Sequence, residues 1–285
     1  MAKKGFVSLV GAGPGDAELM TVKAVRLLQQ ADVVVYDRLV SADILSLIPA
    51  GVSRISVGKE VGKHCVPQQQ INEIIVNLAK AGRKIVRLKG GDPYLFGRGG
   101  EEVQALNEQQ IAFEVVPGIT AASGCSSYSG IPLTHRGMSR RVQLITGHFN
   151  DNEPLDLNWQ SIADPDSTIV IYMGLSNLPL AVHSLIDAGL PASTPAAAVQ
   201  NGTTQAQQRV ITTLDQLNDA IHQRRMKAPV MIIIGQVVSL ADELDWFQLS
   251  LDENRLDENR LDENRLEEMQ LENDFAENGL REQAK

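Results

Sequence analysis

A glycine-rich segment, residues 88–102, constrains the fold more than any other part of the chain. It follows an apolar run, Lys84–Leu88, that is typical of a strand, and leads into a helix-like run, Glu101–Gln110. Six of its fifteen residues are Gly or Pro, which indicates a backbone shaped to approach something closely. Open α/β sheets bind ligands where a strand ends and a helix begins, so the segment predicts a ligand site in an α/β fold. A tight connection without a ligand is the alternative, although such a connection needs only one Gly.

The first half of the chain alternates strand-like and helix-like runs. Strands are expected at Phe6–Val10, Ala31–Tyr36, Ser53–Val57, Lys84–Leu88 and Phe113–Val116, and helices at Ala17–Gln30 and Gln68–Ala81. In the second helix Ile71, Ile74, Ile75, Leu78 and Ala79 share one face. This alternation predicts a mostly parallel sheet covered by helices.

A second set of elements begins near Arg140. Strands are expected at Val142–Thr146, Thr168–Met173, Ala196–Gln200, Arg209–Thr213 and Val230–Gly235, and helices at Leu178–Ala188 and Leu214–Arg225. The segment Gly130–Ser139 has little periodicity and carries Pro132 and Gly137, which is typical of a boundary. We therefore expect an N-terminal α/β domain over residues 1–133 and a C-terminal α/β domain over residues 134–248.

Residues 249–285 form a charged tail in which Leu-Asp-Glu-Asn-Arg occurs three times. Its leucines recur every five residues, so on a helix they spiral around the axis and form no heptad seam. We expect a solvated appendage, disordered or partly helical, with an oligomerising coiled coil as the alternative.

The composition limits the partners and the compartment. The net charge is −9, but residues 1–248 hold 23 acidic and 21 basic residues, so the body is nearly neutral and no nucleic-acid partner is expected. Cys65 and Cys125 lack metal-ligand spacing and indicate a reducing compartment, and no metal is expected. Apolar runs are too short to span a bilayer. We expect a soluble cytoplasmic protein with no membrane partner.

Residues Gly11–Asp16 lie between the first strand and a helix and suggest a dinucleotide site, with Asp37 as the ribose-binding acid. Asp16 stands where the third Gly of that motif belongs, and its carboxylate repels a pyrophosphate. Pro14 also removes one backbone N–H. We interpret the segment as a rigid turn in which Asp16 caps the following helix.

Several motifs, taken in order, resemble one known family. They are Val10-Gly-Ala-Gly-Pro-Gly-Asp16, Val34-Val-Tyr-Asp-Arg-Leu-Val40, Arg87-Leu-Lys-Gly-Gly-Asp-Pro93, Phe96-Gly-Arg-Gly-Gly-Glu-Glu102, Val115-Val-Pro-Gly-Ile-Thr-Ala-Ala122, Pro132-Leu-Thr-His-Arg136 and Tyr172-Met-Gly174. The chain resembles the tetrapyrrole methylases from about Gly5 to Phe247, and its Phe-Gly-Arg-Gly-Gly-Glu-Glu and Thr-His-Arg pieces point to the uroporphyrinogen-III C-methyltransferase branch. The repeat tail is outside the resemblance.

The resemblance implies a two-domain α/β fold with the active site in the cleft between the domains, and a homodimer. It implies transfer of two methyl groups from S-adenosylmethionine to carbons 2 and 7 of uroporphyrinogen III. The products are S-adenosylhomocysteine and, through precorrin-1, precorrin-2, the branch point to sirohaem, cobalamin and d-type haem.

The family also assigns roles to residues of this chain. The cofactor contacts that it implies are Pro14, Gly90, Gly91, Asp92, Leu95, Thr120, Ala121, Met173 and Gly202. Asp92 could instead form a turn before Pro93, and Met173 would be a core residue without the family match.

The substrate is a macrocycle fringed with carboxylates, which guanidinium groups bind bidentately. Arg98 and Arg136 are the expected substrate residues, together with Met173, and Arg140 and Arg141 are weaker candidates. Glu101 could orient Arg98 or contact pyrrole N–H groups, or it could only favour the start of the following helix.

The family offers Asp37 as proton acceptor and Lys59 as proton donor. An ion pair between Asp37 and Arg38 and a surface position for Lys59 are the alternatives. Three rival functions remain at this point: a related methylase acting on a later corrin intermediate, a nicotinamide-dependent oxidoreductase, and a scaffold that acts through the charged tail.

Overall fold

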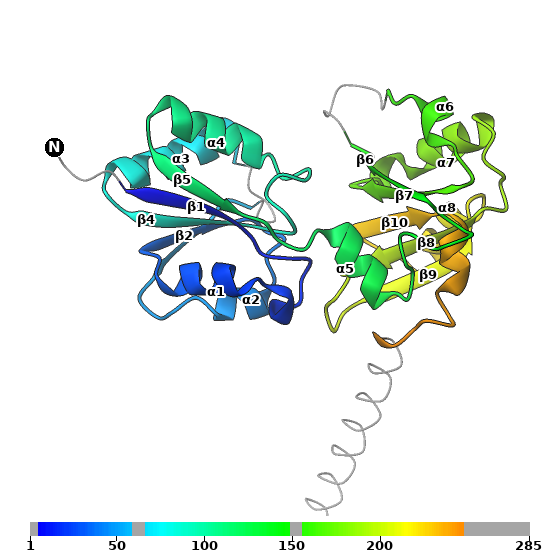
Figure 1. Cartoon of the computed structure of the whole chain (residues 1–285), viewed down its shortest axis with the longest axis horizontal. Coiled ribbons are helices and arrows are strands. Elements are labelled where there is room, and N and C mark those ends of the chain that lie inside the picture. Colours follow the sequence, from blue (N-terminus) through cyan, green and yellow to red (C-terminus); the bar gives the residue numbers. More distant parts are fainter. Residues whose placement is uncertain (1–4, 59–65, 149–155, 248–285) are drawn as a thin grey trace, which may run out of the picture.

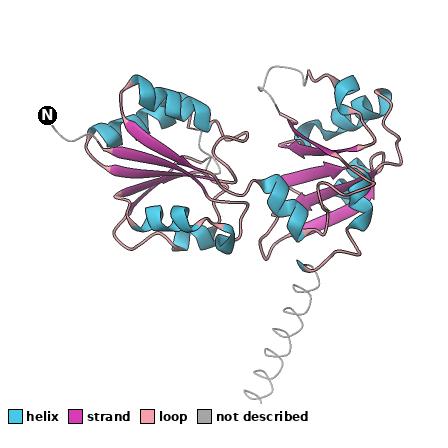
Figure 2. Cartoon of the chain, in the orientation of Figure 1, coloured by secondary structure: helices cyan, strands magenta, loops and turns pink. Residues whose placement is uncertain are grey.

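The computed structural model describes residues 5–58, 66–148 and 156–247. Lys59 and the repeat tail, both subjects of predictions from the sequence, lie outside these residues. Figures 1 and 2 show two sheets side by side, each covered by helices. The α/β class predicted from the alternating runs is therefore confirmed.

The first sheet contains five strands in the order β3-β2-β4-β1-β5, and every neighbouring pair is parallel. The strands are β1 (Phe6–Gly11), β2 (Val33–Tyr36), β3 (Ser53–Ser56), β4 (Lys84–Lys89) and β5 (Ala112–Val116). Helices α1 (Val22–Gln29) and α2 (Ala42–Ser46) cover one face, and α3 (Gln68–Lys80) and α4 (Gly99–Glu108) cover the other (Figure 1). Because all strands run the same way, their carboxyl ends lie along one edge.

The apolar face predicted for the helix after Gln68 is the face that packs on the sheet. Ile71, Ile75 and Ala79 of α3 are buried, and Ile74 and Leu78 are partly buried against the same core. The prediction of one helix over residues 17–30 is wrong. Asp16 caps a short 3-10 turn (Ala17–Leu19), the chain then extends, and Thr21 accepts a hydrogen bond from the Ala24 amide to start α1 anew.

The second sheet is mixed, with the order β6-β7-β10-β8-β9. Its strands are β6 (Arg141–Thr146), β7 (Ser167–Tyr172), β8 (Pro195–Gln200), β9 (Gln208–Thr213) and β10 (Val230–Ile234). β6 and β7 are parallel, and the other three pairs are antiparallel. β7 and β8 both run opposite to β10, so their carboxyl ends lie on the same edge.

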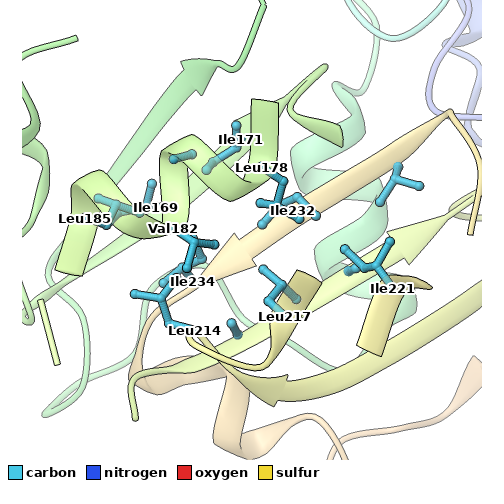
Figure 3. Close-up of a cluster of buried hydrophobic side chains, with 14 of the residues drawn as sticks. Ile169, Ile171, Leu178, Val182, Leu185, Leu214, Leu217, Ile221, Ile232 and Ile234 are labelled. Carbon is cyan, nitrogen blue, oxygen red and sulfur yellow. The ribbon is translucent and has the colours of Figure 1, made fainter. Parts of the chain in front are cut away.

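Helices cover both faces of this sheet as well. On one face, α6 (Trp159–Ile162), α7 (Leu178–Asp187) and α8 (Leu217–Gln223) enclose an aliphatic core built from alternate residues of β7 and β10. Figure 3 shows Ile169, Ile171, Ile232 and Ile234 meeting Leu178, Val182, Leu185, Leu217 and Ile221 in this core. On the other face, α5 (Ala121–Tyr128) and a 3-10 turn (Gln236–Leu240) pack on Val170, Ala197, Val199 and Ile233.

Helix α5 belongs to the core of the second sheet although it precedes residue 133. The chain leaves the first sheet at Val116 and enters the second at Arg141, and α5 lies on the way between them. The boundary at residues 133 and 134 stays a prediction.

Candidate active site

Most of the residues predicted for the site follow strands of the first sheet at its carboxyl edge. Pro14 lies just after β1, Asp37 directly after β2, Gly90–Asp92 after β4 and Thr120 shortly after β5. On the second sheet, Met173 follows β7 and Gly202 follows β8, on the edge that these two strands share.

Hydrogen bonds join the two edges directly. The hydroxyls of Thr120 and Tyr172 are 2.5 Å apart, and Tyr172 also accepts a bond from the buried Ala122 amide at 3.1 Å. The amide of Asp16 donates to Thr203 Oγ1 at 3.1 Å, which ties the turn after β1 to the turn after β8. The carboxyl edges of the two sheets therefore face each other (Figure 1).

Glycines allow the backbone to pack closely at this edge. Gly13 and Gly91 exchange two backbone hydrogen bonds, of 3.2 and 2.7 Å. A Cβ on Gly11 would stand 2.5 Å from the amide nitrogen of Gly118, and one on Gly118 would overlap the carbonyl oxygen of Gly91. The segments after β1, β4 and β5 thus touch backbone to backbone, which only Gly permits.

Gly91 also keeps space open in front of α5. Its φ is +67°, in the left-handed region that favours Gly, and an added Cβ would point toward the Ala121 amide nitrogen from 3.7 Å. The amides at the start of a helix attract carboxylate groups. The glycine-rich loop therefore lies against the start of α5, where helix amides can attract a carboxylate.

Asp92 holds the glycine-rich loop in place. Its Oδ1 accepts a hydrogen bond from the Tyr94 amide at 2.8 Å, and its Oδ2 accepts one from the Gly118 amide at 3.1 Å. The first of these bonds is the turn-forming role given above as an alternative. The second fixes the loop after β4 to the segment that leads into α5.

Asp16 caps the short turn after β1, as predicted. Its Oδ1 accepts the Glu18 amide at 2.9 Å and its Oδ2 accepts the Tyr128 hydroxyl at 2.8 Å. A carboxylate thus occupies the amide-rich position where a dinucleotide site would hold phosphate, which counts against a nicotinamide-dependent oxidoreductase.

Five non-glycine residues with positive φ lie around the joined edges. They are Phe96 (54°), Arg98 (58°), Met173 (52°), Asn201 (49°) and Thr203 (69°), and strained backbone of this kind gathers at functional sites. The Phe96 ring lies 4.9 Å from that of Tyr172, and Leu95 packs against the core of the second sheet. Met173 is 51% exposed, so it is not the core residue that its chemistry alone would suggest.

Tyr172 was missed as a site residue, although it stands in one of the motifs. Burial is the main cause that raises the pKa of its phenol, so the hydroxyl stays protonated and available for hydrogen bonding.

Arg98 and Glu101 form a bidentate pair, with Nε–Oε1 and Nη2–Oε2 distances of 2.8 and 2.7 Å. The hydrogen bond to Glu101 is the main cause that raises the pKa of Arg98, and the same bond lowers the pKa of Glu101. Glu101 therefore orients Arg98, which is one of the three roles considered for it. Both side chains are about half exposed, at 57% and 49%, so the guanidinium remains accessible.

The other candidate arginines lie further along the chain. Arg136 is exposed on the turn between His135 and Ser139, whose backbones form an isolated bridge. Arg140 is exposed, and Arg141 pairs with Asp164 at the surface. The pairing with Asp164 gives Arg141 a structural role.

Asp37 pairs with strand β4 rather than with Arg38. Its Oδ1 accepts a hydrogen bond from Arg87 at 2.5 Å, and its Oδ2 lies 3.7 Å from Lys89 Nζ. Both cations also contact Glu102 of α4. The sequence assigned none of these three residues to the site, and Lys84–Leu88 was predicted only as an apolar strand.

Three further observations concern the described residues as a whole. Within residues 5–58, 66–148 and 156–247, no group of three or more His, Cys, Asp or Glu residues could hold a metal ion. In the same ranges no helix is long and apolar enough to cross a bilayer. An open groove of about 460 Å³ lies beside α1, lined by residues such as Met20, Val25 and Leu47. It contains none of the predicted site residues.

The family model for tetrapyrrole (corrin/porphyrin) methylases matches residues 7–218, a range that includes every predicted site residue. The chain belongs to the tetrapyrrole methylase family. The fold expected from the motifs is therefore confirmed at the level of the family.

Solved structures of other tetrapyrrole methylases share the fold. Uroporphyrin-III C-methyl transferase from Thermus thermophilus, complexed with S-adenyl homocysteine, is 37% identical with a TM-score of 0.71, over 82% of this chain and 93% of that one. A cobalt precorrin-4 methyltransferase is 27% identical with a TM-score of 0.73, over 82% of this chain and 95% of that one.

Among curated proteins, siroheme synthase from Methylococcus capsulatus is 51% identical over 244 residues, 86% of this chain. Those residues are 52% of the relative, so the chain spans about half the length of this synthase.

Proposed function

We propose that this methylase transfers two methyl groups from S-adenosylmethionine to carbons 2 and 7 of uroporphyrinogen III, giving precorrin-2 through precorrin-1. The observation that carries the proposal is the meeting of the Gly90–Asp92 loop, the start of α5 and Met173 on the facing edges of the two sheets. Family membership and the likeness to the Thermus thermophilus enzyme support it. Because only half of the siroheme synthases is matched, the proposal covers methyl transfer alone.

The residues proposed to hold the cofactor fit its chemistry. S-adenosylmethionine supplies a methyl group bound to a sulfonium sulfur. After the transfer, the remainder of the cofactor leaves as a neutral thioether. The space beside Gly91 in front of α5 accepts the amino-acid end, with Thr120 and Ala121 at the helix start. Pro14, Gly90, Asp92, Leu95, Met173 and Gly202 complete the proposed contacts.

The substrate side is proposed to lie at Arg98 and Arg136, with Met173 and Glu101 beside them. Arg98 is held by Glu101 and remains half exposed, so it can meet a carboxylate of the macrocycle without further ordering. Arg98 is the N-cap residue of α4, and its positive φ places its backbone outside the helical conformation.

The reaction needs alignment and the removal of one proton for each methyl added. An electron-rich pyrrole carbon forms the new carbon–carbon bond, and holding the reactants in line can supply about 7–11 kcal/mol of the barrier reduction. A proton then leaves the macrocycle, and its bonding electrons return to the conjugated system. Asp37 at the carboxyl edge is the proposed acceptor, and Lys59, outside the described residues, is the proposed donor.

A later corrin intermediate is the second candidate substrate, because the cobalt precorrin-4 methyltransferase shares the fold. We also propose a homodimer, which light scattering would test, and a cytoplasmic location.

The test is anaerobic incubation with methyl-labelled S-adenosylmethionine and either uroporphyrinogen III or a later corrin intermediate. We expect label in the tetrapyrrole only with uroporphyrinogen III. The Asp37→Asn variant should transfer at least about a hundredfold more slowly, because general-base catalysis contributes that much or more. Label in the later intermediate alone would replace the proposal by the second candidate.

A further inference from the structure

Asp37 belongs to a group of four charged residues behind the proposed site. Asp37 directly follows β2, Arg87 and Lys89 lie on the neighbouring strand β4, and Glu102 lies in the first turn of α4. We call these four residues the buried charge cluster. The roles proposed above for the site use Asp37 alone and leave the other three without a function.

Glu102 is the centre of the buried charge cluster. Its Oε1 accepts hydrogen bonds from Arg87 Nε at 3.0 Å, from Lys89 Nζ at 3.1 Å and from Gln68 Nε2 of α3 at 3.2 Å. Arg87 and Lys89 then reach on to the two oxygens of Asp37. Glu102 therefore touches Asp37 only through the two cations.

The cluster is closed to solvent except at one end. The side chains of Glu102 and Arg87 are 0% and 1% exposed and that of Lys89 is 3%, whereas that of Asp37 is 28% exposed. Glu102 Oε2 is buried and has no hydrogen-bond partner among the described residues. Among these four side chains, as the described residues leave them, Asp37 is thus the one with appreciable exposure, and it lies at the carboxyl edge of the first sheet.

Such a cluster is a poor way to stabilise a sheet. Removing four charges from water costs free energy that their mutual attraction repays only in part, and apolar residues of similar size often do as well. The cluster does hold the Asp37 carboxylate in one orientation. With Oδ1 held by Arg87 and Oδ2 beyond hydrogen-bond distance of Lys89, Oδ2 is the oxygen placed to take a proton.

We infer that Glu102 and Lys89 are positioning residues that aim the Asp37 carboxylate and set its strength as a base, Lys89 by its own contact with Asp37 and Glu102 through Arg87 and Lys89. The inference rests on the proposed role of Asp37 as proton acceptor.

The balance of charge explains how these residues set the basicity. Asp37 lies beside the two cations Arg87 and Lys89, and the negative charge of Glu102 offsets part of their positive charge. Burial is the main cause that lowers the pKa of Lys89, the charge of Arg87 adds to it, and the carboxylates of Glu102 and Asp37 oppose it. Glu101 in α4 and Arg38 in the turn after β2 are the other charged neighbours along these elements.

Two substitutions of opposite sign test the inference. Glu102→Gln keeps the shape but leaves two cations acting on Asp37, so the acidic limb of the kcat–pH profile should move to lower pH. The maximal rate should fall about three- to tenfold, because the base becomes weaker. Lys89→Met removes one cation, so the limb should move to higher pH. Glu102→Asp keeps the charge and should restore the limb toward its original position.

Glu114→Gln is the matched control. Glu114 pairs with Lys23 and accepts a bond from Ser8, away from the cluster, so its loss should leave the limb in place. Calorimetry with S-adenosylhomocysteine shows whether each variant is folded and binds cofactor, and we expect no change in affinity. If Lys89→Met fails to fold, the test rests on the two Glu102 variants. The acidic limb should then move to lower pH in Glu102→Gln and return toward its original position in Glu102→Asp.

Limbs that move in opposite directions support the inference. Limbs that stay in place, or that move the same way in both variants, overturn it while Asp37→Asn remains inactive. If Asp37→Asn is as active as the original protein, the proposed acceptor is wrong and the positioning role falls with it.

Discussion

Gly202 lies against Cys125 so closely that a methyl group there should destabilise the protein. Gly202 is buried after β8, and a Cβ on it would overlap Cys125 Sγ. The next nearest atom would be Cys125 Cβ, at 3.4 Å, which is an ordinary contact. The clash is therefore with one sulfur atom, itself confined between α5 and the second sheet.

The cost can be estimated from this geometry. Gly202→Ala adds one methyl group to a filled core, which costs about 1–3 kcal/mol. Cys125→Ala removes the sulfur and leaves a small cavity, at about 1 kcal/mol, as for the loss of one methyl group. In the double variant the clash is absent and the new methyl group partly fills the cavity. It should be less destabilised than the sum of the single variants, by about 1–3 kcal/mol.

The measurement is urea unfolding of the four proteins, followed by the fluorescence of Trp159 and Trp246. Gly100→Ala is the control, because a Cβ there meets nothing within 4 Å and Ala favours the helix. Equal stability of Gly202→Ala and the original protein, or a double variant that is simply additive, would refute the reasoning.

Three further predictions follow from single contacts. The pKa of Tyr128 is raised to about 12, mainly by burial and then by Asp16, so its neutral form stabilises the fold below about pH 10 and this contribution fades toward pH 12. The stability of the Tyr128→Phe variant should therefore not show this decline between about pH 10 and 12, and unfolding midpoints at pH 8 and 11 check this. Burial raises the pKa of Cys125 to about 12, so peptide mapping after iodoacetamide treatment should find Cys125 alkylated only in denatured protein. Tyr172→Phe leaves the buried Ala122 amide without its acceptor and should cost about 1–3 kcal/mol in urea unfolding, and no loss would contradict the bond.

Local chemistry made much of the fold predictable. Most strands of the first sheet are rich in Val, Ile or Leu, and the buried residues of α3 recur every three or four positions. Asp16 was recognised as a cap because its geometry depends only on the next two residues. Each of these features is set within one element.

Features that depend on distant segments were not predicted. Helix α5 has the sequence Ala-Ala-Ser-Gly-Cys-Ser-Ser-Tyr, which has weak helix propensity and no apolar stripe. It forms because Ala122 and Cys125 pack on the second sheet, while Gly124 lets Pro14 of the other sheet approach.

The buried charge cluster was missed for a related reason. Arg87 and Lys89 are two residues apart on β4 and share one face of the sheet, but the sequence does not show which helix covers that face. A sign was available, because two charges on a central strand covered on both sides need partners. Glu102, thirteen residues after Lys89, could not be chosen over Glu101 without the rotation of α4.

The count of methyl groups on the macrocycle tests the central claim most directly. After anaerobic turnover of uroporphyrinogen III with excess S-adenosylmethionine, the mass of the extracted tetrapyrrole is measured by mass spectrometry. We predict two added methyl groups, with almost none in the Asp37→Asn variant. An unchanged macrocycle, from protein that still binds S-adenosylhomocysteine, would contradict the account.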